Sequence, residues 1–488
     1  LYSSAASDVY KRQTPFYTNF QSQGFPVDGL SVEGFMGFGT LGGGNLSVNV
    51  GGDAGVLKPM TTLFSSAATS QGLTLAVGST GRVAPDGRVV STGGGDLSLQ
   101  ISGALNPYKT SRGSPVATID GPPSDLNGVL TNLRGSIAVG ARSIGRVDPL
   151  YAIGDPSDAR GVNPLRPTLA ASSGGVVIVA GDATARLGAR GDLVLGGAGD
   201  AGRMYQFAAS PFTQQGVTQP GGANTWFTLW TERTAVDLFA AGGAVTPFAA
   251  AHFDGSASKD YAQFSASSYA GAFAYPARFA AVAASGSIYY HATSAPGSTE
   301  WVFAPGAQGE VALLAAGGLY GGGLRTSMSG ADPARVPTVD RPAYAAAWNN
   351  GQIQSTNATG LEGGLFAFGV NSAGGRGPVA NAGIARFYAG GDIVGLQTGS
   401  TPAFAAGPEY HAARPVSIQA GGDIVNLKAL ILNQQPTDVS RIVAGRDILY
   451  ANVDIAGPGW LEVTAGRNLT QEDKGRPVSY THLRAHET

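Results

Sequence analysis

The residues whose type and spacing could do chemistry are three aspartates and an asparagine that recur in copies of one short pattern. Asp392, Asp423, Asp447 and Asn468 each follow Ala-Gly-Gly or Ala-Gly-Arg and precede Ile or Leu. In a stack of repeated coils these side chains would lie about 4.8 Å apart. A retaining glycosidase holds its two carboxyl groups about 5–5.5 Å apart, so a catalytic pair is one interpretation.

A structural turn explains the pattern better. Asn468 replaces aspartate in the last copy, and the interval from Asp392 to Asp423 leaves room for an insertion between coils. Glycine supplies the positive-φ conformation that tight turns use, and short Asp or Asn side chains bond to the turn's own backbone. We therefore expect structural turn residues here, not an enzyme, and the sequence predicts no catalytic, cofactor-binding or metal-binding residue.

A second motif, an Arg-Gly-Asp tripeptide, indicates a possible protein partner. Arg190, Gly191 and Asp192 resemble the integrin-binding tripeptide of some adhesins. The surrounding sequence, GARGDLVLG at 188–196, is also a copy of the turn pattern, as are GGGNLSVNV at 42–50 and GGGDLSLQI at 93–101. The repeat thus explains the tripeptide without a receptor.

Composition excludes several classes of function. The chain has 488 residues, of which 74 are Gly and none is Cys, with 31 Lys and Arg against 33 Asp and Glu. Without cysteine there are no disulfides, thiolate metal sites or cysteine nucleophiles. The balanced charge offers no basic stripe for nucleic acid. No apolar run reaches the ~18 residues of a membrane span, so we expect no transmembrane segment.

The elements that must position the turn residues are short strands. Apolar and polar residues alternate with a period of two, which is typical of half-buried strands. The clearest runs are Leu46, Val48, Val50; Leu73, Leu75, Val77; Leu97, Leu99, Ile101; Val416, Ile418, Ala420; and Leu461, Val463, Ala465. A repeat of ~20–30 residues with such strands and tight turns predicts an all-β parallel β-helix with long loop insertions. A propeller would carry Trp-Asp or Gly-His signatures, and neither dipeptide occurs.

Two ladders are expected in the core. Ile393, Ile424, Ile448 and Leu469 each follow the turn residue directly, at a fixed offset from the alanine that opens each copy. We expect the four to stack inward on successive coils. The corresponding alanines, which should form a second ladder at the corner, are Ala389, Ala420, Ala444 and Ala465.

Composition shifts divide the chain into five parts. Residues 1–13 and 478–488 resemble translated sequencing-adapter read-through, and we expect neither to pack on the solenoid. Between them the sequence indicates β-helix repeats over 14–200, an Ala- and aromatic-rich solenoid with long excursions over 201–380, and regular AGGDI-type coils over 381–477. A separate β-rich domain is the alternative for 201–380. Segments rich in Pro, Ser, Gly and Asp at 54–70, 103–132 and 146–172 indicate loops that leave the helix.

Aromatic residues in the excursions are the candidate binding residues. Trp226, Trp230, Tyr269 and Tyr275 lie in the aromatic-rich stretch 201–300. Large, rigid aromatic side chains in loops offer contact area to glycans or proteins at little conformational cost. The alternative is that they cover the solenoid edge or pack under their own loops.

The repeats resemble those of the large exoproteins of the filamentous haemagglutinin family. The resemblance is carried by FYAGGDIVGL at 387–396 and by the segments 230–247, 277–290 and 415–475. It implies a right-handed parallel β-helix, of which this chain would be an internal piece, secreted through an outer-membrane transporter by the two-partner route. It also implies an extracellular or cell-surface location in a Gram-negative bacterium.

The resemblance implies a structural rod segment of an adhesin that contacts glycans or proteins of host or bacterial cells. Two alternatives are a β-helical polysaccharide-active enzyme and the stalk of a contact-dependent toxin. The enzyme would need a convergent cluster of charged residues, which the sparse charge disfavours. The toxin domain would lie downstream of this sequence.

Overall fold

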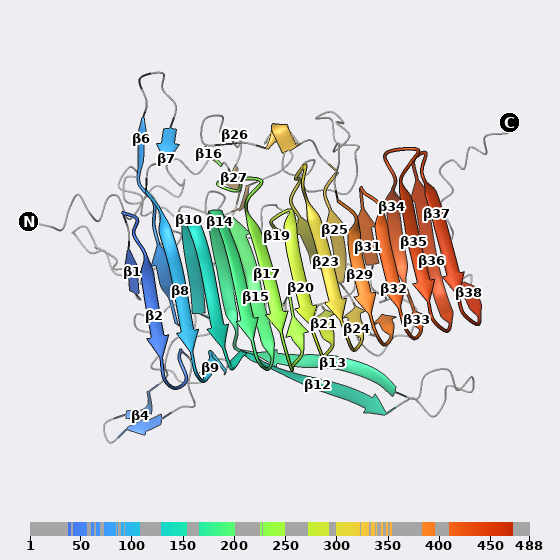
Figure 1. The fold of residues 1–488 in the computed structure, drawn as a ribbon, viewed down its shortest axis with the longest axis horizontal. Helices are drawn as coiled ribbons and strands as arrows, with labels where there is room; N and C mark the ends of the chain where they lie inside the picture. The colour runs from blue at the N-terminus through green and yellow to red at the C-terminus, as the bar shows by residue number, and fades with distance from the viewer. Residues whose placement is uncertain are drawn as a thin grey trace, which may run out of the picture.

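The computed structural model describes residues 38–471 with gaps, the longest of which are 108–127, 201–224, 249–271, 354–382 and 396–408. The described residues are nearly all β-strand, apart from a short 3-10 helix, η5 (Pro333–Arg335). In them, 28 strands form one connected sheet whose coils stack along the long axis of the molecule, from β1 to β38 (Figure 1). Strands within the stack pair in parallel, so the predicted parallel β-helix is confirmed.

Each coil has three faces, named here in the order in which the chain passes through them. The first face is built from β2 (Leu46–Val50), β8 (Gly95–Ile101), the second halves of β10 (Gly128–Ala141) and β14 (Val176–Ala189), β17 (Ala235–Ala240), β20 (Arg278–Ala283), β23 (Glu310–Ala315), β29 (Ala385–Ala389), β32 (Val416–Ala420), β35 (Val439–Ala444) and β37 (Trp460–Ala465). These described strands make ten successive pairings, which at about 4.8 Å each span about 48 Å.

The second and third faces complete the coil. The second face holds β9 (Ala104–Leu105), β11 (Ser143–Ile144), the start of β15 (Leu193–Asp200), β18 (Val245–Thr246), β21 (Ile288–His291), β24 (Leu319–Gly322), β30 (Ile393–Gly395), β33 (Ile424–Val425), the start of β36 (Ile448–Ala456) and β38 (Leu469–Gln471). The third face holds β1 (Phe38–Thr40), β5 (Leu75–Val77), the starts of β10 and β14, the end of β15, β19 (Ala272–Tyr275), β22 (Thr299–Phe303), β25 (Leu324–Met328), β31 (Glu409–Ala412), β34 (Lys428–Leu432) and the end of β36.

Both predicted ladders are confirmed. Ile393 pairs in register with Ile424, and Ile424 with Ile448, and all three are at most 1 % exposed. Leu469 continues this ladder on the last described coil, where it is 57 % exposed. The four alanines also pair in register. Their ladder extends through Ala315, Ala283, Ala240, Ala189 and Ala141, at the corner between the first and second faces.

The middle of the stack has an aromatic core. Tyr275, Phe279 and Trp301 are at most 2 % exposed, and their ring centroids lie 5.3–5.5 Å apart. Phe248 stacks on Trp301 at 5.6 Å. These four aromatic side chains therefore fill the interior of the coils.

The three corners differ in the connections they carry. The turn from the first to the second face is short, ranging from two residues between Ala141 and Ile144 to four between Ala240 and Val245. The longest connections, 201–234 and 329–384, both lead from the third face to the first. The described strands from β17 to β25 pair in parallel with β14 before them and β29 after them, so they belong to the same stack.

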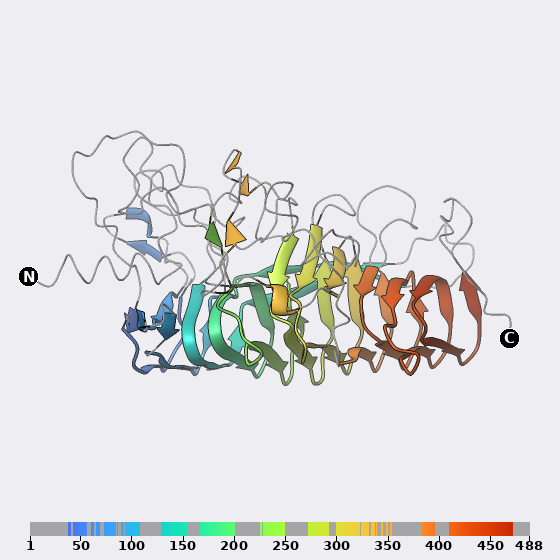
Figure 2. The ribbon, with the colours of Figure 1, turned by 90° about the horizontal axis from the view of Figure 1, so that it is seen from above.

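The segment at 146–172 leaves the coils as predicted, but it is not a loop: β12 (Arg146–Ile153) and β13 (Leu165–Ser173) form a separate antiparallel hairpin. The hairpin extends beside the second face along the stack (Figures 1 and 2). At its root Val147 packs with Val194 and Tyr289.

The predicted loop at 103–132 is partly wrong, since β9 and the start of β10 belong to the coils. Short antiparallel pairs join β3 (Met60–Thr62) to β4 (Ser65–Ala68), β6 (Gly81–Val83) to β7 (Val89–Ser91), β16 (Thr225–Trp226) to β26 (Ala343–Tyr344) and β27 (Trp348–Asn349) to β28 (Gln352–Ile353).

Candidate functional site: a polar ladder and an exposed apolar row

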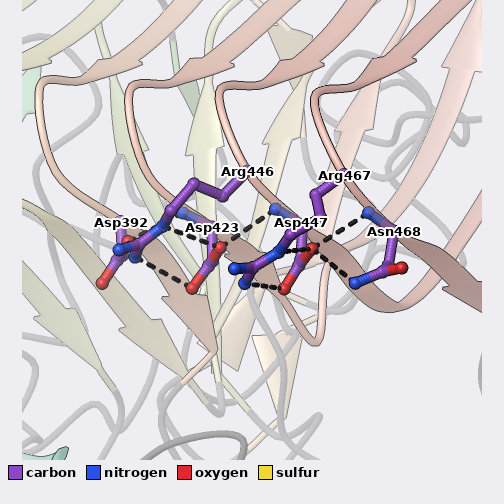
Figure 3. A network of polar contacts seen from close by, with 6 residues as sticks. All are labelled: Asp392, Asp423, Arg446, Asp447, Arg467 and Asn468. Atoms are coloured by element: carbon purple, nitrogen blue, oxygen red, sulfur yellow. Dashed lines mark hydrogen bonds and ion pairs between the residues drawn. The ribbon is translucent and has the colours of Figure 1, made fainter.

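The four predicted turn residues lie between the first and second faces, one above the other along the stack (Figure 3). Asp392 Oδ1 accepts a hydrogen bond from the backbone N–H of Asp423 at 2.7 Å. Asp423 Oδ1 accepts in the same way from Asp447 at 3.0 Å, and Asp447 Oδ1 from Asn468 at 3.0 Å. The turn placement was predicted, but each of these bonds joins two coils, whereas we expected a bond within one turn.

The four stacked residues Asp392, Asp423, Asp447 and Asn468 are called the polar ladder below. Two arginines pair with its three carboxylates. Arg446 Nη2 donates to Asp392 Oδ1 and to Asp423 Oδ2, each at 2.9 Å, so one guanidinium bridges two coils. Arg467 donates from Nε to Asp447 Oδ1 at 2.8 Å and from Nη2 to Oδ2. Such paired, charge-assisted bonds are among the stronger hydrogen bonds in proteins. The carboxylates and guanidinium groups of this corner therefore bind one another along the stack.

Ionisation of Asp447 follows from this arrangement. The hydrogen bond from Arg467, helped by the backbone N–H of Asn468, lowers the pKa of the Asp447 carboxyl to about 2. Hydrogen bonding to Asp423 in turn raises the pKa of Arg446. A glycosidase pair needs one carboxylic acid that stays protonated to deliver a proton. Asp447 is a poor candidate for that acid, because it is ionised at neutral pH.

The glycines of the turn serve close packing, not a positive φ. A Cβ added to Gly421 would lie 2.2 Å from the carbonyl oxygen of Gly390 in the preceding coil. Gly445 meets the Gly421 carbonyl at the same distance, and Gly466 meets that of Gly445. None of these three has φ in the left-handed region. The expected conformational reason was therefore wrong here, and in these coils glycine lets successive backbones approach closely.

Two of the predicted turn copies belong to another corner. In GGGNLSVNV the polar residue Asn45 directly precedes β2, and in GGGDLSLQI Asp96 is the second residue of β8. Asn45 Oδ1 accepts the N–H of Asp96 at 2.9 Å. Here Gly43 and Gly94 do have positive φ. The true first copy, VGGDA at 50–54, was missed because Val and Ala replace the usual Ala and Ile. Asp53 Oδ1 accepts the N–H of Ala104 at 2.6 Å.

The Arg-Gly-Asp tripeptide lies in the same ladder. Asp192 Oδ1 accepts the N–H of Ala244 at 2.9 Å, and Oδ2 accepts that of Val147 at 3.1 Å. Arg190 and Gly191 occupy the positions that Gly390 and Gly391 hold in a later coil. Both oxygens of the Asp192 carboxylate are thus used to hold the coil and the root of the β12–β13 hairpin, which supports the turn interpretation.

The four candidate binding aromatics have different locations. Tyr275 is fully buried, and its hydroxyl donates to the Pro247 carbonyl at 2.9 Å, so its prediction as a loop residue was wrong. It occupies an inward position of β19, where strand alternation directs it into the core. Trp230 is half-buried and donates from Nε1 to the Ala180 carbonyl at 3.0 Å. Trp226 belongs to β16, but its side chain, like all of Tyr269, lies outside the described residues.

An exposed apolar row on the first face was not predicted. Phe239 and Tyr388 are 49 % and 47 % exposed. Between them, in register on β20 and β23, lie the half-buried Val282 and Leu314. These four residues are called the apolar row below. Their outward position could have been inferred from AVDLFA and ARFYA, in which the residue before the corner alanine points away from the core.

Ion pairs flank the apolar row. Arg186 lies 3.7 Å from Asp237, and Arg386 pairs with Glu310. Each pair joins neighbouring strands of the first face, and the exposed Arg278 on β20 adds a further positive charge near Asp237. The row therefore presents an apolar surface, bordered by charged side chains, with an aromatic ring at each end.

One buried cation lies away from both features. Arg414 is 1 % exposed and donates from Nη1 to the Gly309 carbonyl at 2.6 Å. Burial lowers its pKa to about 10. Since Gly309 and Arg414 come from different coils, this bond also joins coils and is structural.

The described residues include neither a metal-binding cluster nor a membrane-spanning helix. No group of three or more His, Asp or Glu residues among them is placed to hold a metal ion. Within the same residues, no helix is long and apolar enough to cross a membrane. Comparison of the chain with protein-family models, curated proteins and solved structures gives no significant match.

Proposed function

We propose that this chain is a non-catalytic rod segment of a secreted or surface-displayed bacterial adhesin. The observation that carries the proposal is the unbroken stack of described coils, in which the polar ladder and the buried side chains join one coil to the next. Residues committed to coil packing are unavailable for chemistry, whereas outward residues vary without breaking the stack. Such a rod holds binding surfaces away from the cell.

The apolar row supports a binding role for the coils themselves. Exposed aromatic residues on an apolar surface suit uncharged partners such as glycans or the apolar patches of cell-surface proteins. Trp226 and Tyr269 remain proposed contributors from the excursions. Secretion through an outer-membrane transporter and a location on or outside a Gram-negative cell are part of the same proposal, through the family resemblance.

Adhesion of cells to the immobilised protein, together with a glycan array, tests this function. We expect the double variant Phe239→Ser/Tyr388→Ser to lose most of the binding, because both rings leave the surface while the core is untouched. Gln419→Ser/Thr464→Ser is the matched control, since these exposed residues lie in register with the row on later strands. Trp226→Ala/Tyr269→Ala measures the contribution of the excursions.

Three results would contradict the proposal. The first is the absence of binding to any cell or glycan, and the second is equal binding by the wild type and by both aromatic variants. The third is hydrolysis of a polysaccharide by the purified protein, which would favour the enzyme alternative.

A further inference from the structure

Outward side chains of the second face are buried, unlike those of the first face. Each directly follows a residue of the inward ladder, so it points away from the core. These seven residues, called the shielded row below, are Val194, Thr246, Tyr289, Tyr320, Val394, Val425 and Leu449. All are at most 7 % exposed except the half-buried Tyr320, whereas the outward Phe239 and Tyr388 of the first face are 49 % and 47 % exposed. The burial of this row therefore requires a covering element.

The β12–β13 hairpin contacts the shielded row at the hairpin root. Val147 of β12 is 5 % exposed and packs against Val194 and Tyr289. Its backbone N–H donates to Asp192 Oδ2 at 3.1 Å, which fixes the root to the coil. The second strand of the hairpin, β13, contacts β21, the strand that carries Tyr289. The hairpin is therefore seated on the row where the row begins.

The length of the hairpin matches the length of the row. The nine residues of β13 extend about 30 Å at ~3.3 Å per residue. The seven residues of the row lie on successive strands of the second face, whose six intervals of about 4.8 Å span about 29 Å. The hairpin also follows the long axis of the stack, as the row does (Figures 1 and 2). One hairpin is thus long enough to pass over the whole row.

No strand of the described stack depends on the hairpin for its pairing. β12 and β13 pair only with each other, in a two-stranded sheet of their own. Covering the row also has a cost, because Thr246 Oγ1 is buried and has no hydrogen-bond partner among the described residues. A buried hydroxyl without a partner loses the hydrogen bonds that water would supply. Departure of the hairpin would break no pairing of the stack and would return this hydroxyl to water.

We propose that the β12–β13 hairpin is a removable strap that shields an apolar surface on the second face. In the closed position, the root contacts of Val147 hold the strap on the shielded row. Without the strap, the row becomes a continuous apolar surface of the kind that binds partners or drives association. This surface is separate from the apolar row, which lies on the first face.

A deletion tests the strap. Residues 148–171 are removed, and Val147 is joined to Ser172 through Asn-Gly. These two residues are partners in the hairpin register, and an Asn-Gly turn links antiparallel strands. Hydroxyl-radical labelling, read by mass spectrometry, should then rise severalfold at Tyr289 and Tyr320, because the deletion opens both side chains to solvent.

Two internal references and a matched control accompany this labelling. Tyr275, which is fully buried in the coils, should stay protected with and without the strap. Tyr388, which is exposed on the first face, should be labelled equally in both proteins. The control variant instead lacks residues 82–90 of the β6–β7 hairpin, with the gap closed by the same turn. It should leave Tyr289 as protected as in the wild type.

A point variant loosens the strap in the full chain. Val147→Asp places a charge in the apolar root contact, beside Asp192, so labelling of Tyr289 should rise while Tyr275 stays protected. Protection of Tyr289 and Tyr320 in a deletion variant with an intact core would overturn the proposal, because another element would then cover the row. Labelling of Tyr275 in the deletion variant would also overturn it, because the stack would then need the hairpin. Both outcomes are independent of the adhesion assay, which reports on the first face.

Discussion

At the scale of the residue, the turn glycines show how the coils approach one another. Gly421 leaves no room for a Cβ because the Gly390 carbonyl of the preceding coil would lie 2.2 Å away. Gly51 holds the same position on the first coil, where nothing lies within 4 Å of an added Cβ. The same residue type at equivalent positions is therefore under different constraints.

Substitution of these two glycines tests that account. We expect Gly421→Ala to lower the free energy of unfolding by about 1–3 kcal/mol, the usual effect of overpacking. Gly51→Ala should change it by no more than about 0.5 kcal/mol. Chemical denaturation of both variants measures the difference. Equal losses would show that backbone conformation, not coil contact, selects glycine in this turn.

The polar ladder predicts that the stability of the protein depends on pH through the carboxylate of Asp447. The pKa of Asp447 is about 2 in the folded protein, against about 3.9 for an unperturbed aspartate. A lowered folded-state pKa adds stability that is fully present above about pH 4 and is lost as the pH falls towards 2. Asparagine fits the turn, as Asn468 shows, but its neutral amide cannot form an ion pair with the guanidinium of Arg467.

We therefore expect Asp447→Asn to melt at a lower temperature than the wild type at pH 7. The gap should narrow as the pH falls from 4 to 2. Asp454→Asn, at an exposed position on β36, serves as the control and should show no such narrowing. A gap that is constant from pH 7 to pH 2 would mean that the charge of Asp447 contributes nothing to the stack.

At the scale of the element, strand alternation decides whether an aromatic residue fills the core or faces solvent. Tyr275 takes an inward position on β19 and is fully buried, whereas Tyr388 takes an outward position on β29 and is 47 % exposed. Aromatic content alone did not show which tyrosine is buried and which is exposed, because this depends on the position of each residue in its strand.

Truncation of the two tyrosines checks this distinction. Tyr275→Ala should lower the free energy of unfolding by about 3–5 kcal/mol, as large-to-small changes of core aromatics do. Tyr388→Ala should change it by no more than about 0.5 kcal/mol. Denaturant titration of the two variants gives the comparison. A similar, small effect for both would place Tyr275 outside the core.

Features of the fold that recur in the sequence could be predicted, whereas features that depend on strand register could not. The Ile393–Ile424–Ile448 ladder could be predicted because turn, offset and apolar residue recur together in the sequence. The β12–β13 hairpin could not, since its Pro- and Gly-containing sequence resembles a loop and its strands pair only with each other. The partners of the polar ladder were also unpredictable, because bonds between coils depend on register and not on the turn itself.

At the scale of the whole molecule, the stack places residues that are distant in sequence at fixed intervals along one axis. Arg186 and Glu462 are linked through seven successive in-register pairings across the first face. At about 4.8 Å for each pairing, their Cα atoms should lie roughly 34 Å apart. The separation is fixed only if every intervening coil is continuous with its neighbours.

A spin-label distance between these two positions tests the continuous rod most directly. The chain contains no cysteine, so Arg186→Cys and Glu462→Cys introduce the only labelling sites, both exposed and on the outward surface. Pulsed electron paramagnetic resonance on the doubly labelled protein should give one narrow distribution centred near 34 Å, within the length of the labels. A broad distribution, or one centred far from that value, would contradict the account by showing that the two halves of the chain do not share one stack.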